Sequence, residues 1–377
     1  MLERETNDLI TRVGPGTPCG ELLRRYWHPV AVAAELTEET PKKRVRILGE
    51  DLVLFRLPCQ GPDGVTEYGL LDEHCSHRRA SLYYGFVEED GLRCAYHGWK
   101  YDNKGRCVDQ PFESDPEFKK EVCHRAYPVE KLSGLLFAYM GPAEKKPLLP
   151  RWDFLVEADW PRKIEVQPVL NCNWLQPTEN AVDPSHTHYL HGETFRIKGL
   201  RDPSYNLRKI EHFEFEACDW GIRKRRVFSN GEKEVGHLLV FPNLLRHPGS
   251  LHFRVPIDDT HTQIFRIIRL NTPASGLALE SDGLPVQYIH TKNEQGEFHM
   301  NTFPSQDAMA WETQGPLTDR FRELLGESDR GITLFRKMLR DQIRNVQQGD
   351  EPIGLVRDAT QNRIIKFVTT EWRGGEE

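Results

Sequence analysis

The 377-residue sequence contains no run of apolar residues near the roughly 18 that a membrane-spanning helix requires. Its first residues, Met1 to Glu5, lack the basic segment followed by an apolar segment that marks a secretory signal. No internal repeat and no low-complexity segment is present. The lack of an apolar span and of a secretory signal predicts a cytoplasmic protein that does not partner with a membrane.

The sequence also has no excess of basic residues, because its formal net charge is −7, which argues against nucleic acid as a partner. Its eight cysteines lie in a long chain with no recognisable secretory signal, so we expect metal ligands or buried thiols instead of a disulfide framework. The hydrophobic share of 38% is ordinary for a globular protein. The length exceeds the roughly 250 to 300 residues at which single cores stop growing, so we expect two domains.

We divide the sequence into three parts. Residues 1–40 have two short stretches of helical periodicity and form a helical capping segment. Residues 41–145 contain short alternating runs between glycines and prolines, which predict a small antiparallel β domain. These runs are Val45–Leu48, Leu52–Arg56, Tyr68–Leu71 and Gly134–Met140. A linker rich in proline and lysine leads into residues 146–377, the expected catalytic domain.

The strongest motif lies in the β domain, where Cys75 and His77 are followed by Cys94 and His97. Two thiolates and two imidazoles from two loops are the ligand set of a Rieske [2Fe–2S] centre. A structural zinc site is the alternative, since two cysteines and two histidines also suit tetrahedral Zn²⁺. The single-residue gap in the first pair is cramped for zinc, and Trp99 supplies an apolar cover for a cluster.

Around these ligands, Cys75–Ala80 and Arg93–Asp102 resemble the α-subunits of Rieske non-haem iron oxygenases, particularly the phthalate dioxygenase-like group. Two departures from the family pattern are Arg79, where glycine is common, and Ala95, where proline is common. Ala80 stands where respiratory Rieske proteins carry a disulfide cysteine, which favours the oxygenase branch.

A second group of metal-capable side chains lies between Asn180 and His191. The family pattern Asn-x-x-Asp-x-x-His-x-x-x-x-His falls on Asn180, Asp183, His186 and His191, and the resemblance implies that the two histidines bind iron. His188 is then an ordinary polar residue. Two histidines completed by one distant carboxylate form the facial triad of non-haem iron oxygenases.

The spacing of His186 and His191 has a geometric consequence. Residues five apart on a regular α-helix point about 140° apart, so they could not bind one ion together. We therefore predict a π-type widening or a break in this segment.

Asp183 has two compatible interpretations. It could cap a helix with Pro184 in the first turn. The resemblance also implies that Asp183 links an iron-ligand histidine to a Rieske histidine of a neighbouring subunit. Asn180 belongs to the same catalytic pattern.

The resemblance assigns the third iron ligand to Asp307, with Glu312 and Asp319 as competing candidates. Asp307 could also be a first-turn carboxylate that the helix dipole favours.

For the catalytic domain we expect a curved antiparallel sheet covered by helices at Ser305–Leu325 and Asp329–Gln347. The expected strands are Leu207–Phe215, Ile222–Phe228, Gly236–Phe241, Ser250–Val255 and Thr262–Leu270. The resemblance implies the α+β helix-grip (START-like) arrangement. In the run Arg223–Arg226 at most two side chains would point inward, because strand side chains alternate; we expect the run to be solvated at the surface.

The implied protein is the terminal oxygenase component of a Rieske system, with a [2Fe–2S] cluster and a mononuclear Fe(II). It would take electrons from NAD(P)H through a separate reductase of the flavin and iron–sulfur type. It would use O₂ to dihydroxylate or monooxygenate an aromatic compound, as a homotrimer or a dimer of trimers. Two alternatives stay open: an O-demethylase or ether-cleaving monooxygenase, and a Rieske electron-transfer protein without oxygenase activity.

Overall fold

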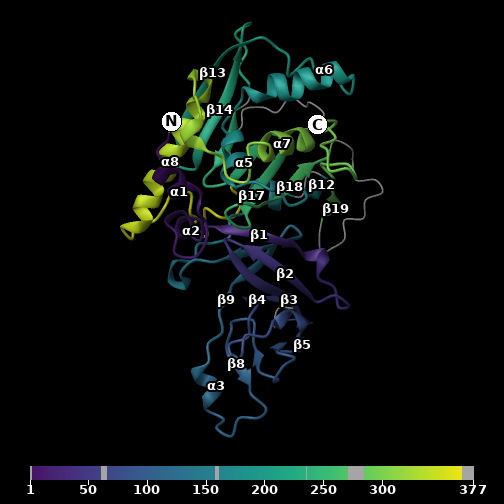
Figure 1. Ribbon diagram of the computed structural model, residues 1–377, viewed down its shortest axis with the longest axis vertical. Helices are drawn as coiled ribbons and strands as arrows, with labels where there is room; N and C mark the ends of the chain where they lie inside the picture. The colour runs from purple at the N-terminus through teal and green to yellow at the C-terminus, as the bar shows by residue number, and fades with distance from the viewer. Residues whose placement is uncertain (1, 61–65, 158–160, 235, 271–283, 367–377) are drawn as a thin grey trace. The chain divides into compact units, whose positions relative to one another are not determined.

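The structure is a computed structural model that describes residues 2–60, 66–157, 161–234, 236–270 and 284–366. Within these residues, no helix combines the length and the apolar character needed to cross a membrane. The chain forms two compact units (Figure 1). One comprises residues 24–149, and the other combines residues 1–23 with the described residues from 150 onward.

The unit of residues 24–149 is built from three small antiparallel sheets, with strand orders β1-β11-β10, β2-β3-β4-β9 and β5-β6-β7-β8. Its strands are β1 (Trp27–Val32), β2 (Lys42–Ile47), β3 (Glu50–Gln60), β4 (Thr66–Asp72), β5 (Phe86–Glu88), β6 (Gly91–Arg93), β7 (Lys100–Tyr101), β8 (Cys107–Asp109), β9 (Ala126–Tyr127), β10 (Val129–Leu132) and β11 (Leu135–Tyr139). Its short helices are η1 (Ala33–Glu35), η2 (Leu82–Tyr84), α3 (Phe118–Glu121) and η3 (Ala143–Lys145). The four strands expected from the alternating runs are confirmed.

The core of this unit surrounds the first metal motif. Val53, Phe55 and Leu71 from two neighbouring strands pack in one cluster with Cys75 and Cys94. The two cysteines therefore stand on a closely packed base, which limits how far their sulfur atoms can move.

The other unit contains an eight-stranded sheet of order β13-β14-β15-β16-β17-β18-β12-β19. Its strands are β12 (Arg162–Val166), β13 (Ile210–Cys218), β14 (Gly221–Phe228), β15 (His237–Val240), β16 (Leu244–His247), β17 (Ser250–Pro256), β18 (Thr262–Arg269) and β19 (Val286–Tyr288). Neighbours are antiparallel except β12 and β19, which run parallel. The five expected strands are confirmed, whereas β12, β16 and β19 were not foreseen.

Helices of this unit are α1 (Arg4–Thr11), α2 (Pro18–Leu23), α4 (Asp153–Val156), α5 (Leu175–Asn180), η4 (Thr187–Glu193), α6 (Thr194–Lys198), α7 (Phe303–Glu312), η5 (Arg320–Arg322), η6 (Glu327–Asp329) and α8 (Arg330–Gln347). The expected helix near 329–347 is confirmed as α8. The expected helix from 305 to 325 is wrong in its second half, because α7 ends at Glu312. Gly315 with φ +92° and Pro316 follow, and a proline lacks the N–H needed to continue a helix.

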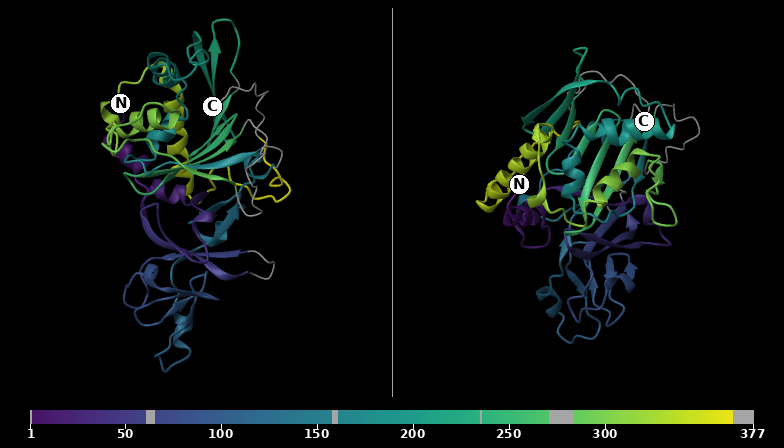
Figure 2. Two further views of the ribbon diagram at one scale, coloured as in Figure 1. Left: turned by 90° about the vertical axis from the view of Figure 1, so that its right-hand side faces the viewer. Right: turned by 45° about the horizontal axis from the view of Figure 1, so that its top comes forward.

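One face of the sheet is covered by α7 and by the helical segment around η4. Ile264 of β18 packs against Ala308 and Trp311 of α7. Lys224 of β14 donates a hydrogen bond from Nζ to the carbonyl oxygen of Asp183, which precedes η4 (3.0 Å). Figure 2, right, shows the teal and green helices crossing this face. The second metal motif thus lies between helices and sheet.

Candidate metal centres

The Cys-His loops of the 24–149 unit are two turns of the same shape. The N–H of Arg79 donates to the carbonyl of Cys75 (2.9 Å), and the N–H of Gly98 donates to that of Cys94 (3.0 Å). The fifth residue of each turn is left-handed, with φ +62° at Arg79 and +79° at Gly98. A left-handed backbone favours glycine, which explains why glycine is common at position 79. Arg79 adopts this conformation while its Nη1 bonds the carbonyl of His74 (2.9 Å).

The four predicted ligands of these loops differ in depth, because the two cysteines are buried and the two histidines are half-buried. The thiols of Cys75 and Cys94 are buried, and burial, with a smaller contribution from the neighbouring Cys94 thiol, raises the pKa of Cys75. The rings of His77 and His97 lie with centroids 4.6 Å apart. His77 Nδ1 is buried and has no hydrogen-bond partner among the described residues. Inner thiols and outer imidazoles fit a [2Fe–2S] cluster, whose positive irons would stabilise both thiolates.

Three residues that the motif did not reveal support these loops. The hydroxyl of Tyr101 lies 3.1 Å from Cys75 Sγ. The ring of His124 stacks on Tyr101 with centroids 4.5 Å apart. Its Nε2 lies 2.9 Å from the carbonyl of Asp72, so that nitrogen carries the hydrogen and Nδ1 accepts from Ser76 Oγ (2.8 Å).

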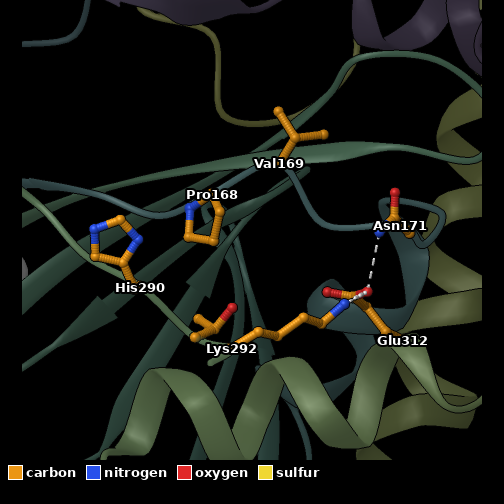
Figure 3. A pocket seen from close by; sticks show the side chains of 7 residues that line it. Pro168, Val169, Asn171, His290, Lys292 and Glu312 are labelled. Atoms are coloured by element: carbon orange, nitrogen blue, oxygen red, sulfur yellow. Dashed lines mark hydrogen bonds and ion pairs between the residues drawn. The ribbon is translucent and has the colours of Figure 1, made fainter. Parts of the chain in front are cut away.

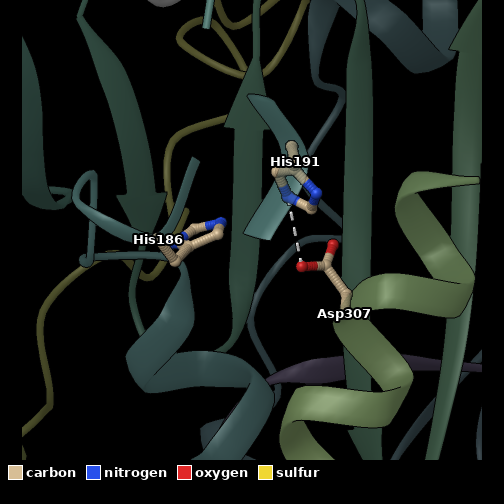
Figure 4. Close-up of side chains that lie close together, drawn as sticks. All are labelled: His186, His191 and Asp307. Carbon is tan, nitrogen blue, oxygen red and sulfur yellow. Dashed lines mark ion pairs between the residues drawn. The ribbon is translucent and has the colours of Figure 1, made fainter. Parts of the chain in front are cut away.

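The second motif brings together His186, His191 and Asp307. One ligand atom from each lies within 4.8 Å of the others. Figure 4 shows the three side chains converging from the segment before η4, from η4 and from α7. The stretch Thr187–Glu193 is a π-helix, with His186 at its N-cap. This confirms the predicted widening, and the two rings lie with centroids 5.2 Å apart.

Polar atoms at this triad face one another in a way that calls for a cation. His191 Nε2 lies 3.4 Å from Asp307 Oδ1, an atom that is buried and has no hydrogen-bond partner among the described residues. On the other side of the ring, Nδ1 lies 2.7 Å from Gln306 Oε1. Because that oxygen only accepts, Nδ1 carries the hydrogen and the Nε2 lone pair faces a carboxylate. Two nitrogens and one carboxylate fit Fe(II) in this place.

Charge interactions at the triad keep its acids ionised. Burial by itself would raise the pKa of Asp307, but His191, His186 and Arg254 outweigh it and the pKa is lowered. Burial would likewise raise the pKa of Asp183, whereas the hydrogen bond and charge of His186 hold it below its usual value.

Asp183 lies next to the triad and does not cap a helix. Its Oδ2 is 3.4 Å from His186 Nδ1, and its Oδ1 accepts from the backbone N–H of Ser185 (2.7 Å). The helix-cap interpretation is therefore wrong, because His186 occupies the N-cap of η4. Asn180 ends α5, and its carbonyl accepts from the N–H of Asp183 (3.0 Å).

The competing acids are placed elsewhere. Glu312 accepts from Lys292 Nζ (2.7 Å) and Asn171 Nδ2 (3.2 Å) at the wall of a pocket of about 210 Å³ (Figure 3). Asp319 precedes η5. Asp307 lies within α7, whose N-cap is Thr302. His188 lies outside the triad, with its ring 5.0 Å from that of Tyr189.

The basic run of β14 alternates as expected, but the expected surface solvation is wrong for half of it. Arg223 and Arg225 pair with acids of β13, whereas Lys224 and Arg226 are 5% and 2% exposed. Arg226 Nη1 donates to Thr187 Oγ1 (2.9 Å). Burial lowers the pKa of Lys224 to about 8. The sequence Arg223–Arg226 alone could not predict that helices cover the face of the sheet on which Lys224 and Arg226 lie.

On the same face, Arg254 of β17 is 2% exposed. Its Nε and Nη1 are buried and have no hydrogen-bond partner among the described residues. Burial lowers the pKa of its guanidinium to about 9, while the charge of Asp307 opposes this shift. Nearby Arg266, in contrast, donates to Glu165 (2.7 Å). No sequence pattern marked Arg254.

Two family models match the chain. Residues 26–128 match the Rieske [2Fe-2S] domain, and residues 287–374 match the LigXa C-terminal domain like family.

Several characterised proteins are similar over nearly the whole chain. The 5,5'-dehydrodivanillate O-demethylase oxygenase subunit of a Sphingobium species is 38% identical, over 98% of this chain and 87% of that protein. The phenoxybenzoate dioxygenase subunit alpha of Ectopseudomonas oleovorans is 38% identical, over 92% and 87%. The phthalate 4,5-dioxygenase oxygenase subunit of Pseudomonas putida is 33% identical, over 97% and 92%.

Solved structures share the fold. NdmA of Pseudomonas putida CBB5 superposes with a TM-score of 0.62 at 22% identity, covering 87% of this chain and 93% of that one. The oxygenase in an oxygenase–ferredoxin complex of carbazole 1,9a-dioxygenase gives a TM-score of 0.63 at 19% identity, covering 88% and 90%.

Proposed function

The chain belongs to the Rieske non-haem iron oxygenases as an oxygenase α-subunit with a [2Fe–2S] cluster and a mononuclear iron, and we propose that its substrate is an aromatic carboxylic acid. When bound, the cluster supplies single electrons and the iron activates dioxygen. We assign the cluster to Cys75, His77, Cys94 and His97. We assign the iron to His186, His191 and Asp307.

The observation that supports a carboxylate is the side chain of Arg254. A buried guanidinium without an acceptor is costly, and a carboxylate can accept two parallel hydrogen bonds from it. Arg254 is paired across the sheet with Ile264, which packs against Ala308 of α7, the residue after Asp307. The names of three relatives, acting on dehydrodivanillate, phenoxybenzoate and phthalate, agree with this substrate class.

The test is a panel of aromatic acids, each beside its methyl ester, assayed by coupled oxygen uptake with a surrogate reductase. We expect turnover of acids and little turnover of esters. Arg254→Met should weaken binding of the acid by about 2–5 kcal/mol, because truncating one partner of a buried charge pair costs that much. Arg223→Met removes an arginine from the outward face of β14 and should leave binding unchanged. Equal turnover of acids and esters would exclude the assignment.

The proposed reaction is hydroxylation of the aromatic compound, by dihydroxylation or monooxygenation, with O-demethylation or ether cleavage as the alternative; the relatives named above include both a dioxygenase and an O-demethylase at 38% identity. Product mass after reaction under labelled dioxygen separates them. Dihydroxylation retains both oxygen atoms in the product, whereas demethylation shortens the substrate by a methylene unit.

Electrons would come from NAD(P)H through a separate reductase or a ferredoxin, as the oxygenase–ferredoxin complex of carbazole 1,9a-dioxygenase illustrates for a protein of this fold. We further propose a homotrimer, in which Asp183 connects the iron of one subunit to the cluster of the next. The solution mass should then be three times the 43.7 kDa of one chain, or six times for a dimer of trimers. A monomer with full activity would contradict the proposal.

A further inference from the structure

Two consecutive residues of α7 contact opposite nitrogens of one imidazole. Asp307 Oδ1 lies 3.4 Å from His191 Nε2, and Gln306 Oε1 lies 2.7 Å from His191 Nδ1. Gln306 is fully buried. The iron ligand His191 is therefore held from both sides by neighbours in the sequence.

The orientation of the Gln306 amide follows from its second contact. Its Nε2 lies 3.1 Å from the carbonyl oxygen of Met300, which can only accept a hydrogen bond. The NH₂ end of the amide must point there, so Oε1 points to His191. Because Oε1 also only accepts, Nδ1 of His191 carries the hydrogen, and the lone pair of the neutral ring is on Nε2.

The anchor for Gln306 is itself fixed by hydrogen bonds. The N–H of Met300 donates to Ser305 Oγ (3.2 Å), and Ser305 Oγ donates to the carbonyl of Thr291 (2.6 Å). Met300 has a left-handed backbone, with φ +55°. This arrangement holds the Met300 carbonyl in the place where it can receive the Gln306 amide.

We infer that Gln306 is a positioning residue for the mononuclear iron: it sets the tautomer and orientation of His191, so that Nε2 is ready to bind. A hydrogen-bond acceptor on the second nitrogen of a ligand histidine commonly contributes to metal affinity. His186 has the carboxylate of Asp183 in the equivalent position, at 3.4 Å. The two ligand rings are thus supported unequally, one by a charge and one by a neutral amide. The inference concerns iron loading and does not depend on the substrate.

The experiment measures Fe(II) binding by equilibrium dialysis and metal analysis, using full-length protein stripped of its mononuclear iron but retaining the cluster. The variants are Gln306→Leu and Gln306→Glu, with Gln314→Leu as the matched control. Gln314 is exposed and lies just after α7; its Nε2 donates to the carbonyl of Ala310 (2.9 Å) and its Oε1 accepts from Thr318 Oγ1 (3.2 Å), so it contacts neither iron ligand. Circular dichroism and the thermal unfolding midpoint report that the unit holding the iron site is folded in each variant, and the visible absorbance reports the cluster.

We expect Gln306→Leu to weaken Fe(II) binding roughly 10- to 100-fold, while Gln306→Glu, which keeps an acceptor, binds about as well as the unaltered protein. A glutamate carboxylate has no N–H to donate to Met300, so a purely structural role for Gln306 would make both variants fail. Binding by Gln306→Leu equal to that of Gln314→Leu, or failure of both substitutions at 306, would overturn the inference. If Gln306→Leu does not fold, Gln306→Asn is tested in its place: its shorter side chain moves the acceptor away from His191 by one methylene and should weaken binding in the same way.

Discussion

The Oδ2 atom of Asp183 lies 3.4 Å from Nδ1 of His186, on the side of the ring opposite the nitrogen that is free to bind a metal. An aspartate in this position orients the ligand ring, and in the proposed trimer it would also provide the electron path from the cluster. We expect Asp183→Asn to retain both metal centres and to lose most product formation. Iron analysis, the cluster spectrum and product yield check this, and an Asp183→Asn enzyme of full activity would remove Asp183 from the electron path.

The iron site should depend on Asp307 and not on Glu312. Asp307→Ala removes an anionic ligand and should abolish binding of the mononuclear iron, leaving about two irons per chain in the cluster. Glu312→Ala breaks contacts with Lys292 and Asn171 and should retain about three irons per chain. Elemental analysis of both variants decides the assignment, and the reverse result would refute it.

The hydroxyl of Tyr101 should raise the reduction potential of the cluster, because its hydrogen bond to Cys75 Sγ stabilises the more negative, reduced state. Tyr101→Phe should lower the potential by an amount on the order of tens of millivolts. Spectroelectrochemistry measures the reduction potential of the cluster in each variant. Tyr127→Phe is the control, since that hydroxyl bonds Glu50 (2.8 Å), and an equal change in both variants would count against a specific role for Tyr101.

A buried ion-pair network that joins α5 to η5 and α8 should be needed for stability. Glu179 is 6% exposed and pairs with Arg320 (2.9 Å) and Arg336. Glu179→Gln removes the carboxylate that pairs with buried Arg320, whereas Arg336 keeps Glu323 (2.8 Å), and should cost about 3–5 kcal/mol of unfolding free energy. Asp341→Asn, which breaks an exposed pair with Lys337, should cost less than about 1 kcal/mol. Urea unfolding compares them, and similar losses would show that the network is dispensable.

Lys224 should make stability rise with pH on the alkaline side. Burial lowers its pKa from an ordinary 10.5 to about 8, so between these values the unfolded chain holds a proton that the folded chain has released. Stability is therefore gained as pH rises from about 8 and is lost as pH falls back, by up to about 1.4 kcal/mol per pH unit. The free energy of unfolding of Lys224→Met should lack this slope between about pH 8 and pH 10. Identical slopes would mean that Lys224 keeps its ordinary pKa in the fold.

The Cys-His and His-His ligand pairs could be recognised in the sequence because the members of each pair lie close together and their spacing is set by coordination chemistry. The five-residue interval between His186 and His191 even predicted the π-helix, because no regular helix could bring both rings to one ion. The strands were readable from alternation, which also predicted that two residues of the Arg223–Arg226 run would share a face.

The remaining features depend on contacts between distant segments. Nothing local distinguishes Arg254 from Arg223: only the register of β17 and the helices above it leave the first without an acceptor. Tyr101 and Gln306 are ordinary polar residues until the fold places them against Cys75 and His191. The early end of α7, in contrast, could be predicted from the sequence, because Gly315 and Pro316 disfavour a continued helix.

The strand order of the large sheet determines when its strands can pair while the chain is being synthesised. β12 pairs with β18 and β19, so it emerges from the ribosome roughly a hundred residues before its first partner, or about 5–20 s at usual elongation rates. Helix α1 can contact α8 only when nearly the whole chain has been synthesised. Residues 24–149, in contrast, are continuous and complete early. All four ligands of the cluster are therefore synthesised well before Asp307, so the loops that hold the cluster can fold before the iron site has its carboxylate ligand.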